Sequence, residues 1–277
     1  MSDGNPPLIH LWPGKVPLAG KGEEKAPPEW RGGKPSSNCV KRITDPALEV
    51  FPAPKEKRNG LGVVVCPGGG YSILSIKKEG RAIAKWLNSL GITAFVLRYR
   101  VPGNRDAAFA DALRAYRVVR ADASKWGVSP EKIGFIGFSA GGHLSARVCC
   151  STDKEKSSAY QPVDAADSAP VHPAFAMLIY PAYLDKGSGG SLSRELKILD
   201  ATPPLFVFAT ADDPYSGSLL AIAAAARSAK KSVEAHLYPK GGHGYGLASF
   251  AGRQWPLLAA DWLRRIFPKL KIQDRSK

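Results

Sequence analysis

Six short apolar segments alternate with helical patterns from residue 62 onward, and this alternation constrains the fold more than any other feature of the sequence. Each segment is rich in Val, Ile, Leu or Phe and is bounded by Gly, Pro or Asp, as strands buried on both faces are. They span residues 62–66, 92–98, 133–138, 175–180, 205–210 and 233–238. Alternating strands and helices predict a mostly parallel sheet with helices on both faces. Ligands bind such sheets at the carboxyl ends of the strands, which is where we look for chemistry.

Amphipathic segments between these strands predict the covering helices. In the first, an apolar face runs from residue 82 to residue 90, and Gly91 ends the helix. In the second, an apolar stripe runs from Phe109 to Val119. The charged residues on the other side of this helix are expected to point outward: Asp111, Arg114, Arg117 and Arg120. Segments 219–229 and 257–266 complete the set.

The first 59 residues differ from the rest, because they are rich in Pro, Gly and Lys and show little periodicity. We expect residues 1–59 to form an N-terminal arm packed on the domain, with one possible strand at residues 47–51. A chain of 277 residues fits one large α/β domain better than two small ones. Residues 60–277 are therefore predicted to form a single α/β domain.

The chain carries a formal net charge of +15, but its basic residues are scattered along the sequence. No nucleic-acid-binding motif accompanies them, so we expect a dispersed basic surface, no nucleic-acid partner and at most a leaning toward acidic substrates. The longest apolar run, residues 219–226, is far too short to span a bilayer, so no membrane partner is expected. No export signal opens the sequence as written, which predicts a cytoplasmic protein; a secreted or periplasmic one is the alternative if a leader has been removed. The oligomeric state stays open.

The four cysteines (Cys39, Cys66, Cys149 and Cys150) show no CxxC spacing, so neither a zinc site nor a redox centre is predicted. Three of them fall in an expected strand or at a helix end, where a free thiol packs as a small apolar group. We expect reduced, structural cysteines and no metal or cofactor. A disulfide to Cys39 stays open.

A serine stands between an expected strand and an expected helix, in Gly137-Phe138-Ser139-Ala140-Gly141. A GxSxG sequence in that context predicts a nucleophile elbow, the sharp turn that exposes a catalytic serine at the sheet edge. The serine there adopts a strained backbone, and the flanking glycines let strand and helix approach closely. We therefore expect Ser139 to be a nucleophile; the alternative is an incidental serine in a glycine-rich turn.

A serine nucleophile requires a base, and elimination among five histidines selects His243. It follows the last strand, and glycines on both sides free the backbone to bring an imidazole over the sheet edge. The other four lie in the arm, on the elbow helix, in a Pro-rich loop and inside a strand: His10, His143, His172 and His236. The alternative for His243 is an ordinary surface-loop histidine.

The acid of a triad is expected after the penultimate strand, where Asp212 and Asp213 stand side by side. Only one of them can hold the imidazole in the productive tautomer. Comparison with hydrolase loops that place the acid just before a proline or apolar residue favours Asp213. The other carboxylate is expected to cap the next helix or to bind loop backbone.

The loop Pro67-Gly68-Gly69-Gly70-Tyr71 follows the strand at 62–66, where an oxyanion hole is expected. The backbone amides of Gly69, Gly70 and Ala140 are the natural donors. A phosphate-binding loop is the competing interpretation, but no GKS or GKT sequence follows.

Together these motifs resemble the bacterial acetyl xylan esterase and carbohydrate esterase group of α/β-hydrolases. The resemblance runs from about Leu11 to about Trp262, and three further stretches share it: 11–15, Glu79-Gly80 and 193–195. It implies the α/β-hydrolase fold with a minimal cap, a metal-free serine esterase, and small esters or acetylated carbohydrates as substrates. Two departures, Lys77-Lys78 before Glu79 and Pro67 in place of a histidine, put the acyl range and sugar preference in doubt but leave the triad intact.

Substrate size follows from the short stretch at residues 183–201, which leaves little material for a cap or a deep acyl tunnel. We expect a shallow pocket that prefers acetyl and short acyl groups. Tyr71 and Trp255 are candidates to line it, although both are equally plausible core aromatics. A peptidase or lactonase with the same triad, and a non-catalytic binding module, are the competing functions.

Overall fold

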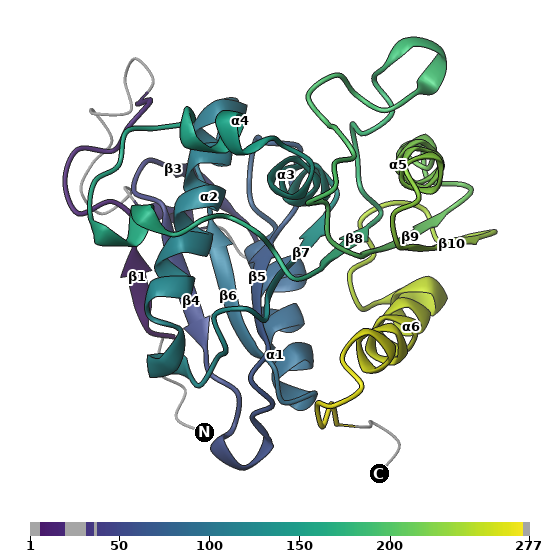
Figure 1. The fold of residues 1–277 in the computed structure, drawn as a ribbon. Helices are drawn as coiled ribbons and strands as arrows, with labels where there is room; N and C mark the ends of the chain where they lie inside the picture. Colours follow the sequence, from purple (N-terminus) through teal and green to yellow (C-terminus); the bar gives the residue numbers. More distant parts are fainter. Residues whose placement is uncertain (1–5, 20–31, 36–37, 274–277) are drawn as a thin grey trace.

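The computed structural model describes residues 6–19, 32–35 and 38–273, and its centre is an eight-stranded sheet (Figure 1). The strands lie in the order β1-β4-β6-β5-β7-β8-β9-β10. β1 and β4 pair antiparallel and the neighbours from β6 to β10 pair parallel, which confirms the expected mostly parallel sheet. The bounds are β1 Leu8–His10, β4 Ala47–Phe51, β5 Gly62–Cys66, β6 Thr93–Arg98, β7 Ile133–Phe138, β8 Ala176–Ile179, β9 Leu205–Thr210 and β10 Val233–Tyr238.

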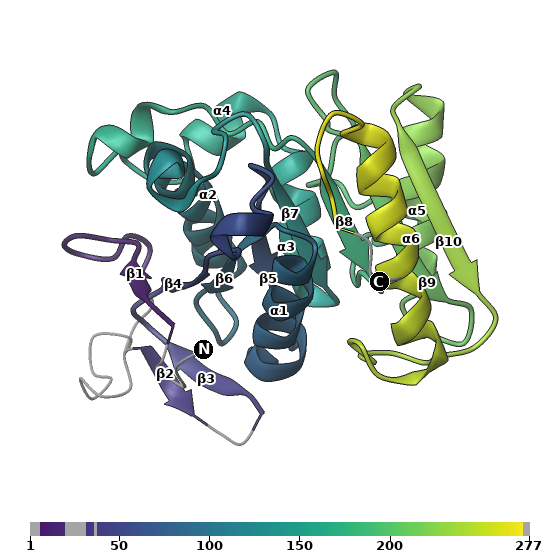
Figure 2. The same ribbon diagram turned by 90° about the horizontal axis from the view of Figure 1, so that it is seen from below.

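Helices cover both faces of this sheet (Figures 1 and 2). α1 (Ala82–Ser89) and α6 (Ser249–Ile266) share one face, where the rings of Trp86 and Trp255 meet at 4.9 Å. α2 (Arg105–Ala121), α3 (Ala140–Cys149) and α5 (Gly217–Ser228) cover the other, and the short α4 (Asp153–Ser157) lies outside α2 and α3. The six strands from β4 to β9 in the sheet order are almost entirely buried between these layers, so the core lies on both faces of the central sheet.

Two elements differ from the sequence expectation. β10 is half exposed, because it is the edge strand of the sheet and has a neighbour on one side only. α6 begins at Ser249, eight residues before its expected start, and continues through Pro256. A proline inside a helix removes one backbone hydrogen bond, which a well-packed amphipathic helix tolerates.

The charged face of α2 does not point outward as we expected. Asp111 is fully buried, Arg114 and Arg117 are nearly so, and Arg120 alone of the four keeps appreciable exposure. The carboxylate of Asp111 accepts from the guanidinium of Arg100. These charges are paired because an isolated buried charge is very costly.

Other segments of the chain cover this face of α2. The indole of Trp12 donates to Asp111 Oδ1 (2.9 Å), and Arg114 Nε donates to the carbonyl of Leu11 (2.8 Å). Arg114 also pairs with Asp164 in the loop before β8. The face therefore became an internal interface between α2, the arm and the segment around residues 160–168.

The N-terminal arm supplies two strands of the main sheet as well as a cover for α2. The strand expected at residues 47–51 is β4, and β1 extends the sheet beyond it. β2 (Gly32–Pro35) and β3 (Val40–Ile43), which the sequence did not predict, form a separate hairpin. The division of the chain at residue 59 stays a prediction.

Cys66, Cys149 and Cys150 are buried free thiols. Burial raises the pKa of the Cys66 and Cys150 thiols to about 12, so they stay protonated and pack as apolar groups. None of the helices described here is long and apolar enough to cross a membrane.

Candidate active site

Ser139 lies in the turn between β7 and α3, with φ of 52° and ψ of −120°. This left-handed conformation is rare for a residue with a side chain and lifts the hydroxyl above the carboxyl end of the sheet. The turn requires its glycines. A Cβ on Gly137 would lie 2.1 Å from the carbonyl oxygen of Gly141, and one on Gly141 would lie 2.0 Å from that of Cys66. The geometry is that of a nucleophile elbow.

The imidazole of His243 bridges the serine and a buried carboxylate. Its Nε2 lies 2.7 Å from Ser139 Oγ, and its Nδ1 lies 2.8 Å from Asp213 Oδ2. Asp213 is 2% exposed, and its other oxygen accepts from the amide of Tyr215 (2.8 Å). A carboxylate that accepts from Nδ1–H leaves Nε2 unprotonated and aimed at the serine, as a general base requires.

The carboxylate of Asp212 binds the backbone of the loop that carries His243 and not the imidazole itself. Its carboxylate accepts from the amides of Gly242 (2.9 Å) and Gly241 (3.0 Å). These bonds, with a further one from Thr210, hold the pKa of Asp212 below its ordinary value. The neighbouring aspartates therefore have separate partners: Asp213 contacts the imidazole, and Asp212 the backbone beside it.

The glycine loop after β5 passes against the serine. A Cβ on Gly68 would lie 2.8 Å from the Cβ of Ser139, so the loop backbone is in contact with the elbow. Gly69 and Gly70 have φ of 136° and 64°, backbone conformations that glycine adopts far more easily than other residues. The amides of Gly69, Gly70 and Ala140 find no acceptor among the described residues. This arrangement suits the three amides to bind a developing oxyanion.

The carboxylate of Glu79 connects the glycine loop to the loop between β10 and α6 that carries His243, which we call the histidine loop. Glu79 lies in a π-helical turn (Ile76–Arg81) and is 3% exposed. It accepts from the amide of Gly68 (2.9 Å) and from the hydroxyl of Tyr180 (2.9 Å). That hydroxyl accepts from the amide of Gly246 (2.9 Å), and the Tyr180 ring lies 5.3 Å from the imidazole of His243. Burial raises the pKa of Glu79, while the two hydrogen bonds and nearby cationic groups oppose that effect.

Trp255 contacts the histidine loop from the core, which favours the core-aromatic alternative over a place in the pocket wall. It is fully buried, and its indole N–H donates to the carbonyl of Gly246 (2.8 Å). Its ring packs on Trp86 and Phe138 in the core. An indole reaches a hydrogen-bond partner when buried, and here the partner lies three residues beyond His243.

Tyr71 is buried beside the glycine loop and binds the second histidine of the region. Its hydroxyl lies 2.7 Å from Nδ1 of His143, whose Nε2 lies 3.2 Å from Glu195. Burial lowers the pKa of His143, which favours the neutral imidazole. His143 is therefore packed one turn beyond Ser139 in α3, as expected. Tyr71 is buried against it and is not exposed to solvent.

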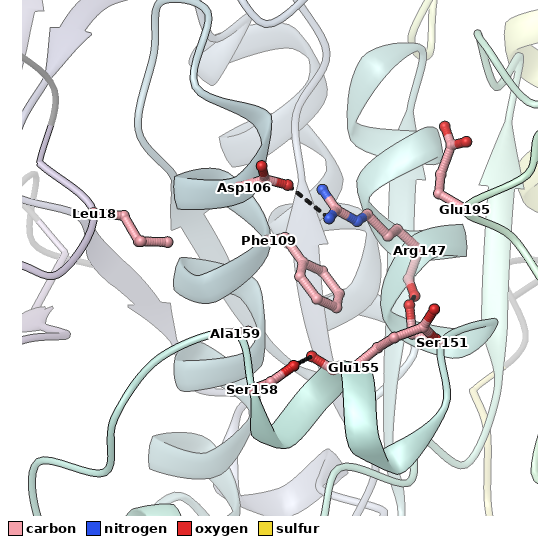
Figure 3. Close-up of a pocket in the computed structure, with 9 residues that line it drawn as sticks. All are labelled: Leu18, Asp106, Phe109, Arg147, Ser151, Glu155, Ser158, Ala159 and Glu195. Atoms are coloured by element: carbon pink, nitrogen blue, oxygen red, sulfur yellow. Dashed lines mark hydrogen bonds and ion pairs between the residues drawn. The ribbon is translucent and has the colours of Figure 1, made fainter.

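A separate pocket of about 340 Å³ lies between α2, α3 and α4 (Figure 3). Ser139, His243 and Asp213 do not line it. Its one basic lining residue, Arg147, pairs with Asp106 (2.7 Å) and stacks on Phe109. Within the ranges that the structure describes, no three His, Cys, Asp or Glu side chains come together as a metal site.

Sequence reasoning missed three aromatic residues of this region: Tyr180, Tyr183 and Tyr215. Tyr180 directly follows β8 at the carboxyl edge of the sheet, and the rule that ligands bind at this edge applied to it as it did to Asp213. Tyr183 and Tyr215 lie in loops, where sequence periodicity gives no signal. The rings of Tyr215 and His243 lie 4.9 Å apart.

Comparison with known proteins finds related enzymes. Residues 63–198 match the family described as the α/β-hydrolase fold. An acetylxylan esterase of Xylanibacter ruminicola is 33% identical over 239 residues, which cover 76% of this chain and 47% of that protein. The chain spans less than half the length of the curated relatives that it matches.

Two solved structures extend the similarity. An acetyl ester-xyloside bifunctional hydrolase from Caldicellulosiruptor lactoaceticus superimposes with a TM-score of 0.75 at 29% identity, covering 96% of this chain and 99% of the other. MGS-M1, an α/β-hydrolase from a Medee basin deep-sea metagenome library, does so with a TM-score of 0.64 at 27% identity, covering 85% and 95%.

Proposed function

This chain belongs to the α/β-hydrolase superfamily, and we propose that it is a serine esterase in which Ser139 carries the acyl group, His243 is the base and Asp213 is the acid. The observation that supports this most is the hydrogen-bonded series from Ser139 Oγ through His243 to Asp213, at a strained elbow. A serine hydroxyl is a weak nucleophile until an adjacent base removes its proton.

The reaction proceeds in two halves. His243 takes the proton of Ser139 as the hydroxyl attacks the ester carbonyl, and the amides of Gly69, Gly70 and Ala140 bind the resulting oxyanion. His243 then gives that proton to the leaving alcohol, which departs from the acyl-enzyme. Water, deprotonated by the same imidazole, releases the acid and restores the serine.

We propose acetyl and other short acyl esters, including acetylated sugars, as the substrates. Two relatives support this class: one is named an acetylxylan esterase and the other an acetyl ester-xyloside hydrolase. Recognition of a sugar takes place outside the triad, in loops that differ between members of one fold.

The test is turnover of 4-nitrophenyl acetate and acetate release from acetylated xylan by the wild type and by Ser139→Ala. We expect both activities in the wild type and a loss of several orders of magnitude in the variant, with unchanged circular dichroism. Hydrolysis of peptides or lactones without ester turnover would favour the competing hydrolases. Absence of all turnover in the wild type would favour a binding module.

A further inference from the structure

A row of aromatic rings leads from His243 to an exposed arginine. The ring of Tyr215 lies 4.9 Å from the imidazole of His243, and the ring of Tyr183 lies 5.6 Å from that of Tyr215. The guanidinium carbon of Arg105 then lies 4.7 Å from the Tyr183 ring centroid. The Tyr183 hydroxyl is 3.7 Å from the position that a Cβ on Gly70 would take, so the row borders the glycine loop.

The charge of Arg105 has no carboxylate partner among the described residues. Its guanidinium rests over the rings of Tyr183 and Tyr71, at 4.7 and 5.0 Å. The adjacent carboxylate, Asp106, is paired instead with Arg147. A guanidinium is always charged, and stacking on rings leaves its N–H edge free for a planar acceptor such as a carboxylate.

The backbone fixes the position of Tyr183. Its φ of 67° lies in the left-handed region, as does the φ of 59° of Tyr71, whose ring also faces Arg105. Such a backbone conformation is strained for a residue with a side chain and persists only where the surrounding structure holds it. The carbonyl of Tyr183 accepts from the hydroxyl of Ser193, which is 1% exposed (2.7 Å). The backbone that carries the Tyr183 ring is therefore held in one conformation.

The row belongs to the leaving-group side of the site. In the proposed reaction His243 protonates the departing alcohol, so this alcohol lies beside the imidazole. Tyr215 packs against the same imidazole, and the row continues from there to Arg105. The rings of Tyr183 and Tyr215 meet edge to face, at 74°. An alcohol as long as a sugar would pack against these two rings and reach the guanidinium with its far end.

We propose that Tyr215, Tyr183 and Arg105, which we name the leaving-group platform, bind a sugar alcohol that bears a carboxylate, so that acetyl esters of acidic sugars are preferred to neutral ones. This inference rests on the proposed esterase function and names its substrate class. The net charge of +15 acts in the same direction, because it attracts anionic substrates over long distances.

The test compares acetylated xylo-oligosaccharides with and without a glucuronate branch, and 4-nitrophenyl acetate, which lacks a sugar. We expect Arg105→Gln to lower kcat/KM for the glucuronate-bearing ester about tenfold, as loss of a charged hydrogen bond does, and to change the other two less than about twofold. The matched control is Arg253→Gln, which removes the same charge from an exposed position on α6, on the opposite face of the sheet. It should leave all three values unchanged.

A second measurement uses the wild type alone. At an ionic strength of about 1 M, where the screening length falls to roughly 3 Å, the preference for the glucuronate-bearing ester should largely disappear. Equal kcat/KM for the acidic and neutral esters, or equal losses for both in Arg105→Gln, would overturn the platform while 4-nitrophenyl acetate turnover still supported the esterase. A wild type inactive on all three esters would overturn both proposals.

Discussion

Asp212 and Asp213 are adjacent in the chain but hold different parts of the site. Asp213 accepts from Nδ1 of His243, whereas Asp212 accepts from the backbone amides of the two residues that precede His243. We expect Asp213→Asn to lower kcat about 10⁴-fold, because an amide favours the wrong tautomer of the imidazole. Asp212→Asn should cost about tenfold, through a less ordered loop. Steady-state kinetics on 4-nitrophenyl acetate measure both, and the reverse order would make Asp212 the acid.

Glu79 is the residue whose contribution extends furthest from its own position. Its carboxylate holds the amide of Gly68 and the hydroxyl of Tyr180, and its charge acts on His243. We expect Glu79→Gln to lower kcat roughly tenfold with little change in KM. Steady-state kinetics on 4-nitrophenyl acetate measure both constants.

Tyr180→Phe is the matched control for this prediction. It removes the hydroxyl that links Glu79 to the amide of Gly246 but keeps the carboxylate. It should lower kcat less than Glu79→Gln does, because Glu79 still accepts from the amide of Gly68. Equal losses in the two variants would place the whole effect in the hydroxyl link to Gly246.

For single residues, the sequence predicts which side chains are candidates for catalysis better than it predicts which side chains contact one another. Ser139 is predictable because the elbow depends on a local pattern, and His243 because few histidines follow a strand. The two aspartates follow the same strand, so only their side-chain directions separate them. The bond between Glu79 and Tyr180 joins residues 101 positions apart, and no local pattern carries such a contact.

Among the elements, α2 shows best that the burial of a helix face depends on other segments of the chain as well as on the helix's own periodicity. Its periodicity correctly predicts a helix with one apolar stripe. Whether the opposite face meets water depends on whether another segment covers it, and here residues 11–17 and 160–168 do. Such a cover is a tertiary contact, and periodicity within one helix contains no information about it.

The buried pair under this cover is a stability prediction. We expect Asp111→Ala to lower the free energy of unfolding by about 3–5 kcal/mol, because it leaves the buried guanidinium of Arg100 without its partner. Asp106→Ala, on the same helix, removes an exposed carboxylate paired with Arg147 and should cost less than about 1 kcal/mol. Urea unfolding followed by circular dichroism compares them. Equal losses would show that the buried pair adds nothing beyond a surface one.

At the scale of the whole molecule, the connection between β8 and β9 is the feature that bears on substrate range. Between β8 and β9 the structure contains no α-helix, only a short 3-10 turn (Ser188–Gly190). Little apolar surface is then available to a long acyl chain, so each added methylene gains little binding energy. We expect kcat/KM for 4-nitrophenyl acetate to exceed that for the octanoate; a ratio below one would reveal a deep acyl site.

The proposed esterase mechanism depends on the nucleophilicity of Ser139, and covalent labelling tests this property most directly. The wild type, treated with a fluorophosphonate and digested, is analysed by mass spectrometry to locate the adduct. We predict a single adduct on Ser139, formed in step with the loss of esterase activity and absent from His243→Ala, which lacks the base. An adduct on another serine, or full inactivation with Ser139 unmodified, would contradict the proposed mechanism.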